Sequence, residues 1–138
     1  TGPVRRINYP HHEADENLGE LLVMNIPDGD VKWRYRQRAP INTAALTTGG
    51  GLVFVGDWNR YYYALDAESG EKLWQTRVNT SAQGFPMSYE IDGRQYIAMP
   101  AGVGGASWSG SLPRDLAPEL NRPRHGNSIN VFALPKAQ

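Results

Sequence analysis

The sequence predicts an all-β protein built from roughly two to three four-stranded blades of a β-propeller. Fifteen Gly and ten Pro among 138 residues lie between short β-rich runs, which is typical of strands joined by tight turns. The segment 64–74, Ala-Leu-Asp-Ala-Glu-Ser-Gly-Glu-Lys-Leu-Trp, is also matched by the segment 23–33, which lies 41 residues earlier. A period of about 40–45 residues is typical of propeller blades.

The residues of this repeat have structural explanations. Asp66 can hydrogen-bond the turn backbone, and Gly70 supplies a positive φ that other residues adopt at a cost. Trp74 then lies on the next strand, where we interpret it as a contact between blades rather than a stacking surface for a ligand. The first copy has the equivalent residues Asn25, Gly29 and Trp33. A third copy, 129–135, is incomplete.

The repeat and the apolar runs predict nine strands in three groups. After an irregular lead-in at 1–19, segment 20–37 holds the two outer strands of one blade, 21–25 and 31–36. Segment 42–78 is a complete blade with strands 43–47, 52–56, 61–66 and 72–78. Segment 84–138 is an incomplete last blade with strands 86–91, 95–100 and 128–134 and a long loop at 101–127. In 61–66, strand alternation places Tyr62 on the face opposite Tyr61 and Tyr63.

Strands grouped as two, four and three do not close a ring, so edges at both ends are expected to lack partners. We expect the N-terminal remainder of the same propeller to cover them and to supply the missing last strand. A self-sufficient sandwich of these nine strands is the alternative.

The composition narrows the classes of function. The 14 basic and 14 acidic residues balance, which argues against nucleic acid or an anionic membrane as partner. There is no Cys, so disulfides, thiolate catalysis, Cys-type zinc sites and haem attachment are excluded from this segment. Its apolar runs are far shorter than the ~20 residues of a membrane helix, so no membrane span is expected.

Several motifs appear in the order found in the C-terminal part of the PQQ-dependent alcohol dehydrogenases, the methanol and ethanol dehydrogenase group of quinoproteins. Together they cover about two-thirds of the chain. They are Thr-Thr-Gly-Gly-Gly-Leu-Val-Phe-Val-Gly-Asp at 47–57, the repeat at 64–74, Gly-Phe-Pro-Met-Ser-Tyr at 84–89, Asp-Gly-Arg-Gln-Tyr-Ile-Ala at 92–98, Gly-Val-Gly-Gly at 102–105 and the ending at 126–135. The sequence thus resembles this family.

The resemblance implies an eight-bladed propeller that holds pyrroloquinoline quinone (PQQ) beside Ca²⁺ or a lanthanide ion. It implies oxidation of a small alcohol in the bacterial periplasm, with electrons passing to a cytochrome c-type acceptor. The family's catalytic base and metal ligands belong to earlier blades, so this segment is expected to contribute cofactor walls and to be inactive alone. A non-catalytic propeller that serves as a protein-binding scaffold is the alternative function.

The resemblance suggests four cofactor-binding positions. Gly105 matches the contact at the end of Gly-Val-Gly-Gly, but Ala106 stands where the family has Trp, and Trp108 follows two residues later. Either Trp108 takes over that role or the cofactor wall is open. Asn42 lies at the start of an innermost strand, near the expected central channel, where it could hydrogen-bond a PQQ oxygen. A turn-forming role of Asn42 is the alternative.

Two further segments invite a functional interpretation. His-His-Glu-Ala-Asp-Glu at 11–16 offers metal-ligand atoms, but no spacing brings three ligands to one face, so a solvated loop is favoured. The charged stretch 107–124 is long for a loop in a compact domain, and such loops often act as lids or interfaces. It either shapes substrate access or is a simple surface excursion.

Overall fold

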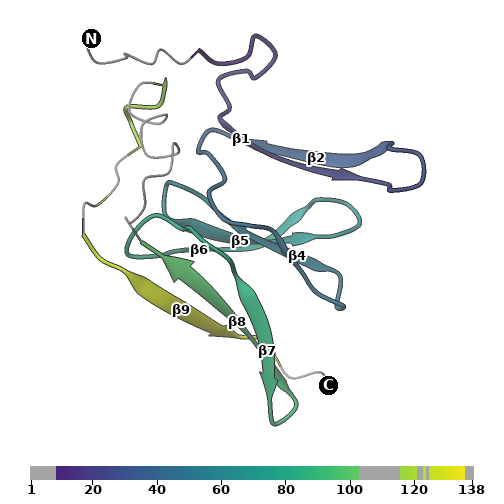
Figure 1. Ribbon diagram of the computed structural model, residues 1–138, viewed down its shortest axis with the longest axis vertical. Coiled ribbons are helices and arrows are strands. Elements are labelled where there is room, and N and C mark those ends of the chain that lie inside the picture. Colours follow the sequence, from purple (N-terminus) through teal and green to yellow (C-terminus); the bar gives the residue numbers. More distant parts are fainter. Residues whose placement is uncertain (1–8, 103–115, 121–122, 124, 136–138) are drawn as a thin grey trace, which may run out of the picture.

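Three antiparallel sheets follow one another in chain order and lie side by side in space in a computed structural model (Figure 1). The structure describes residues 9–102, 116–120, 123 and 125–135. Within these residues the sheets have two, four and three strands, the numbers that the sequence predicts. The predicted fold class, part of a β-propeller, is confirmed.

The strand bounds differ from the predicted ones by a few residues. The first sheet contains β1 (Gly19–Met24) and β2 (Val31–Gln37). The second contains β3 (Leu46–Thr47), β4 (Leu52–Gly56), β5 (Tyr61–Asp66) and β6 (Lys72–Arg77). The third contains β7 (Met87–Ile91), β8 (Arg94–Ala101) and β9 (Ser128–Ala133). The largest difference is at β3, which is predicted to start at Thr43. There the chain makes only isolated bridges before the ladder begins.

The central strands of the second sheet, β4 and β5, are buried on both faces because their side chains alternate between two cores. Phe54, Tyr62 and Ala64 face the third sheet, where they pack with Ile97 and Met99. The other core lies against the first sheet and contains Trp33, Val53, Val55, Tyr63 and Leu65, with Tyr61 packed against it. Tyr62 therefore points away from Tyr61 and Tyr63, as the alternation of a strand predicts.

Trp33 joins the first sheet to the second. Its side chain is 8% exposed, and its indole Nε1 donates a hydrogen bond to the backbone oxygen of Ala67 over 2.9 Å. Gly70 has a φ of +75° at the turn, and a Cβ placed on it would lie 2.7 Å from the indole. The glycine thus serves the turn and also makes room for the tryptophan.

Trp74 differs from its repeat equivalent, Trp33. It is 37% exposed, although its ring meets Phe132 of the third sheet edge-on, with centroids 5.1 Å apart. The third sheet ends at β9, so among the described residues no turn equivalent to the one at Ala67 covers Trp74. Trp33 therefore makes the predicted contact between blades and is buried by it. Trp74 makes the ring contact with Phe132 but stays partly exposed.

Apolar side chains lie exposed on the outermost sheets. Those of the first sheet include Leu22, Met24 and Val31, and those of the third include Met87, Tyr89, Ile91, Ile129 and Val131. A soluble propeller would cover such faces with neighbouring blades. Among the described residues, no helix has the length and apolar character needed to cross a bilayer.

Candidate functional site

Asn42 lies where the second and third sheets meet, at the start of the segment that leads into β3. Its backbone N–H donates to Gly56 over 2.9 Å, and its side-chain Nδ2 donates to the backbone oxygen of Ala82 over 3.1 Å. Ala82 precedes the innermost strand of the third sheet, β7. The Asn42 amide therefore bridges two neighbouring sheets, and the side chain is half-buried.

The two segments that lead to the innermost strands run side by side. Thr43 and Gly84 form a parallel bridge, and the N–H of Ala44 donates to Gly84 over 2.9 Å. Next to Gly84 lies an open depression whose lining contains amides but no carboxylate among the described residues. It is lined by Gln83, Gly84, Pro100, Ala101, Gly102, Asn127, Ser128 and Ile129.

Gly102 is the tightest point of this depression. A Cβ placed on Gly102 would lie 2.6 Å from Oδ1 of Asn127 and 3.5 Å from Nε2 of Gln83. Two carboxamide side chains therefore converge beside Gly102, and a side chain added there would have to displace Asn127. Such a cradle of amide groups suits a ligand that carries several oxygen atoms.

A buried carboxylate lies behind Asn42. Asp57 is 1% exposed; its Oδ1 accepts the N–H of Tyr61 over 2.9 Å, and its Oδ2 accepts Nε2 of Gln37 over 3.2 Å. The hydroxyl of Tyr63 also donates to Oδ2. The backbone oxygen of Asp57 accepts the N–H of Ala82 over 3.0 Å. Asp57 thus ties together all three sheets beside the candidate site.

Burial raises the pKa of the Asp57 carboxyl above its ordinary value, although the hydrogen bonds from Tyr63, Tyr61 and Gln37 favour its charged form. Desolvation outweighs the donors because the carboxylate has no cation among its described contacts. Burial also raises the pKa of Tyr63, and the neighbouring Asp57 adds to this increase. Tyr63 therefore stays a hydroxyl donor to Asp57.

Three of the four predicted cofactor-binding residues, Gly105, Ala106 and Trp108, lie outside the described residues. The chain enters their segment directly from Gly102, which is described. Asn42 is described, and its amide makes the contact with Ala82. Their assignment as cofactor-binding residues stays a prediction.

The described part of the long loop folds back toward the first sheet. Arg38, just after β2, donates from its guanidinium to Oε1 of Glu119 over 2.6 Å and to the backbone oxygens of Leu116 over 2.6 Å and of Glu16 over 2.5 Å. The Arg38 side chain therefore links the described part of the loop to the segment that precedes β1. The salt bridge to Arg38 lowers the pKa of Glu119.

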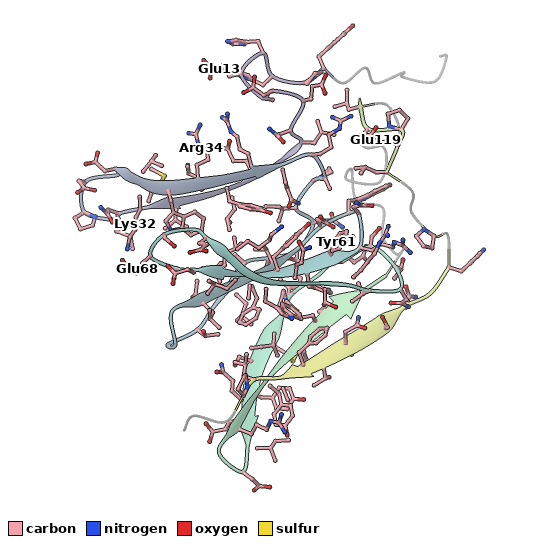
Figure 2. All side chains as sticks on the ribbon, turned by 180° about the vertical axis from the view of Figure 1, so that it is seen from behind. Glu13, Lys32, Arg34, Tyr61, Glu68 and Glu119 are labelled. Carbon is pink, nitrogen blue, oxygen red and sulfur yellow. The ribbon has the colours of Figure 1, made fainter. Side chains whose placement is uncertain are left out.

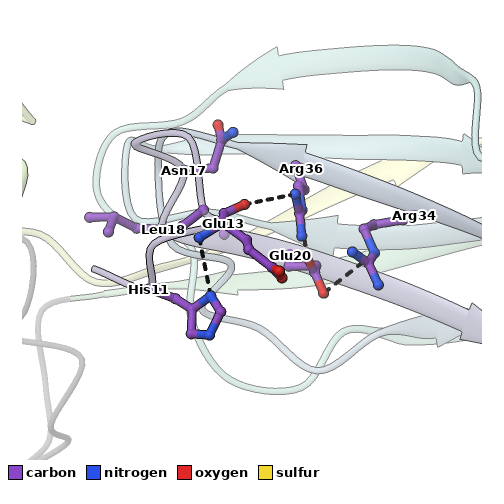
Figure 3. Close-up of a pocket in the computed structure, with 9 residues that line it drawn as sticks. His11, Glu13, Asn17, Leu18, Glu20, Arg34 and Arg36 are labelled. Atoms are coloured by element: carbon purple, nitrogen blue, oxygen red, sulfur yellow. Dashed lines mark hydrogen bonds and ion pairs between the residues drawn. The ribbon is translucent and has the colours of Figure 1, made fainter. Parts of the chain in front are cut away.

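The residues His11, His12 and Glu13 come together as a group of potential metal ligands, with ligand atoms within 4.8 Å of one another. All three are exposed, and Nδ1 of His11 accepts the N–H of Glu13 over 3.2 Å. Figure 3 shows His11 and Glu13 of this group beside Glu20, which pairs with Arg34 and Arg36. The interpretation as a solvated loop stays a prediction.

Sequence reasoning missed the roles of Asp57, Gln83 and Asn127. Asp57 and Asn127 were noted only within family motifs, and Gln83 belongs to none of those motifs. One signal was available: Gln83 lies 41 residues after Asn42, the same offset that separates Trp33 from Trp74.

A family profile described as the β-propeller domain of PQQ-containing glucose, ethanol and alcohol dehydrogenases matches residues 13–97. The quinoprotein ethanol dehydrogenase of Pseudomonas aeruginosa is 37% identical over 124 residues, which are 88% of this chain and 19% of that protein. Subunit 1 of the cytochrome c methanol dehydrogenase of Methylorubrum extorquens is 38% identical over 114 residues, 79% of this chain and 18% of that protein.

A solved structure, that of a europium-containing methanol dehydrogenase, superposes with a TM-score of 0.74 at 26% identity. The match covers 90% of this chain and 24% of that protein. The chain thus spans about a fifth of the length of the curated relatives that it matches.

Proposed function

Because this chain belongs to the PQQ family of glucose, ethanol and alcohol dehydrogenase β-propellers, we propose that it is part of an enzyme that oxidises an alcohol to an aldehyde or ketone. The observation that carries the proposal is the match to alcohol-oxidising quinoproteins over most of the chain. Since the match covers about a fifth of each relative, the activity belongs to the longer protein.

The described residues suit a cofactor wall. The depression beside Gly102 offers the amides of Gln83 and Asn127, and Asn42 lies one segment away. Amide N–H groups are donors that match the carbonyl and carboxylate oxygens of PQQ. When bound, PQQ supplies the electron acceptor for the alcohol, and a metal ion beside it supplies Lewis-acid polarisation.

No carboxylate lines this depression within the described residues, so we propose that the metal ligands and the catalytic base come from other blades. We propose Ca²⁺ or a lanthanide as the ion, and the europium-containing relative supports the second choice. A cytochrome c is the proposed electron acceptor, supported by the name of the methanol dehydrogenase relative. The proposed location is the periplasm.

The structural role proposed for this chain is to form consecutive blades of a complete propeller ring and to contribute part of the wall of the cofactor site. The two-stranded first sheet and the three-stranded third sheet both leave apolar side chains exposed. We propose that the remainder of the same propeller packs against both faces. Covering them would bury apolar side chains that otherwise favour aggregation.

The test is reconstitution of the full-length protein. Apo-protein is mixed with PQQ and either Ca²⁺ or a lanthanide, and dye reduction is followed after the addition of short, long or cyclic alcohols. Alcohol-dependent reduction that requires both PQQ and the ion supports the proposal. Absence of PQQ binding and of dye reduction with every alcohol would favour a non-catalytic scaffold.

A further inference from the structure

Gln83 occupies the same place in the third sheet that Asn42 occupies in the second. The N–H of Asn42 donates to Gly56 over 2.9 Å, and the N–H of Gln83 donates to Pro100 over 3.2 Å. The residues just before them also correspond, because Ile41 bridges Asp57 and Ala82 bridges Ala101, both in antiparallel fashion. The two carboxamides are thus repeated elements of consecutive blades.

The equivalent positions are also neighbours in space. The residues that follow them, Thr43 and Gly84, form a parallel bridge, and adjacent strands lie about 4.8 Å apart. Asn42 and Gln83 therefore start two adjacent innermost segments at the same level. In a propeller, innermost strands surround the central channel, so both residues lie close to it.

The surroundings of the two amides differ. The Asn42 amide is engaged by the backbone oxygen of Ala82, which belongs to the next sheet. The Gln83 side chain instead lines the open depression, and its Nε2 lies within 3.5 Å of a Cβ placed on Gly102. Asn127 reaches the same point, with its Oδ1 at 2.6 Å. Of the two repeated carboxamides, Gln83 is the one that borders an open cavity.

We propose that Gln83, with Asn127 beside it, is a further cofactor-binding residue that donates an amide hydrogen bond to an oxygen of PQQ. This inference rests on the proposed function, since it takes PQQ as the ligand. Gly102 supports this arrangement because its lack of a side chain leaves room for the Asn127 carboxamide beside Gln83.

The experiment measures PQQ affinity rather than turnover. Full-length apo-protein in Ca²⁺ is titrated with PQQ, and quenching of tryptophan fluorescence gives the Kd. Gln83→Met keeps the length of the side chain without a donor, and Gln83→Glu puts a negative charge against a ligand with three carboxylates. The matched controls are Gln75→Met and Gln75→Glu, at an exposed glutamine on β6 whose Oε1 accepts Lys72.

We expect Gln83→Met to raise the Kd about three- to tenfold, as for one lost hydrogen bond, and Gln83→Glu to raise it more. The Gln75 variants should match the wild type. Thermal melting of each apo-protein separates a local effect from unfolding, and a Gln83→Asn variant with a normal melt should recover part of the affinity.

Wild-type binding with both Gln83→Met and Gln83→Glu within twofold of it would overturn the assignment of Gln83 and leave the proposed function standing. A wild-type protein that does not bind PQQ at all would overturn the proposed function and this inference together. The two failures are therefore distinguishable in one titration series.

Discussion

The indole of Trp33 donates a hydrogen bond over 2.9 Å to the backbone oxygen of Ala67, which lies in the turn between β5 and β6 of the neighbouring sheet. Close by, Lys32 pairs with Glu68 across the same boundary (Figure 2). Both acceptors follow the end of β5, so the turn between β5 and β6 is where the preceding blade makes its polar contacts with the second sheet. The tryptophan contact should contribute more to stability than the ion pair, because the tryptophan is buried and the ion pair is largely exposed.

Replacing Trp33 should therefore be costly. We expect Trp33→Ala to lower the free energy of unfolding of the full-length protein by about 3–5 kcal/mol, as for large aromatic truncations in cores. Trp33→Phe keeps a ring but loses the donor to Ala67, so its loss should be smaller. Denaturant unfolding measures both. A change below about 1 kcal/mol for Trp33→Ala would contradict the packing described.

Trp74 tests whether other strands complete the third blade. It is 37% exposed in this chain, but if the rest of the propeller covers it, Trp74→Ala should destabilise the full-length protein about as much as Trp33→Ala. The reason is that a buried indole removes a large apolar area from water. The same unfolding measurement applies. A melting temperature that hardly moves would mean that Trp74 stays at the surface of the complete protein.

Gly70 and Gly29 form a matched pair for separating backbone strain from a steric clash. Both have positive φ values, +75° and +76°, but an added Cβ meets the Trp33 ring at 2.7 Å at Gly70 and nothing within 4 Å at Gly29. We expect Gly29→Ala to cost about 1 kcal/mol from strain alone. Gly70→Ala should cost clearly more in thermal or denaturant unfolding. Equal costs would show that Trp33 does not rest on Gly70.

Asp57 should give a recognisable pH dependence. Burial raises the pKa of its carboxyl in the folded state, so the folded protein binds the proton more tightly than the unfolded chain does. This contribution favours folding at low pH and declines as the pH rises through the acid range. Relative to Asp57→Asn, the wild type should lose melting temperature as the pH rises above about 4, the ordinary pKa of an unfolded Asp. A difference that is constant, or that grows in favour of the wild type, would refute the assignment.

Arg38 should control how firmly the long loop is held. Arg38→Ala removes the bonds to Glu119, Leu116 and Glu16, so limited proteolysis within 101–127 should become several times faster. The melting temperature should change little, since exposed ion pairs contribute about 1 kcal/mol or less. Arg34→Ala is the control, because Arg34 has an ion pair with Glu20 at 3.7 Å and none with the loop residues that the structure describes, 116–120, 123 and 125–127. Equal cleavage of both variants would count against this role.

The fold was predictable because a sequence repeat and the alternation of side chains along a strand are both visible in the sequence. The 41-residue offset between Trp33 and Trp74 predicted which strands belong to which blade. The alternation of side chains in β5 correctly predicted which of its tyrosines lie on each face. The bounds of β3 were less accurate, because Thr43 bonds mainly to a neighbouring segment rather than to a ladder. Signals within one strand carry no information about such contacts.

The candidate site was predicted only in part. Asn42 could be chosen from its place before an innermost strand, but its partner Ala82 belongs to another sheet. The burial of Asp57 likewise depends on Gln37 and Tyr63, which come from different sheets. The convergence of Gln83 and Asn127 over Gly102 unites three distant parts of the chain. No short-range sequence pattern encodes such convergence, because it depends on how distant parts of the chain pack together.

The adjacent tyrosines Tyr62 and Tyr63 serve opposite interfaces, and this constrains how the sequence can change over evolution. Inserting or deleting one residue in β5 would rotate every later side chain to the other face, exchanging the neighbours of two blades in a single step. The length of this strand should therefore be invariant among relatives, while insertions accumulate in the connection between β8 and β9.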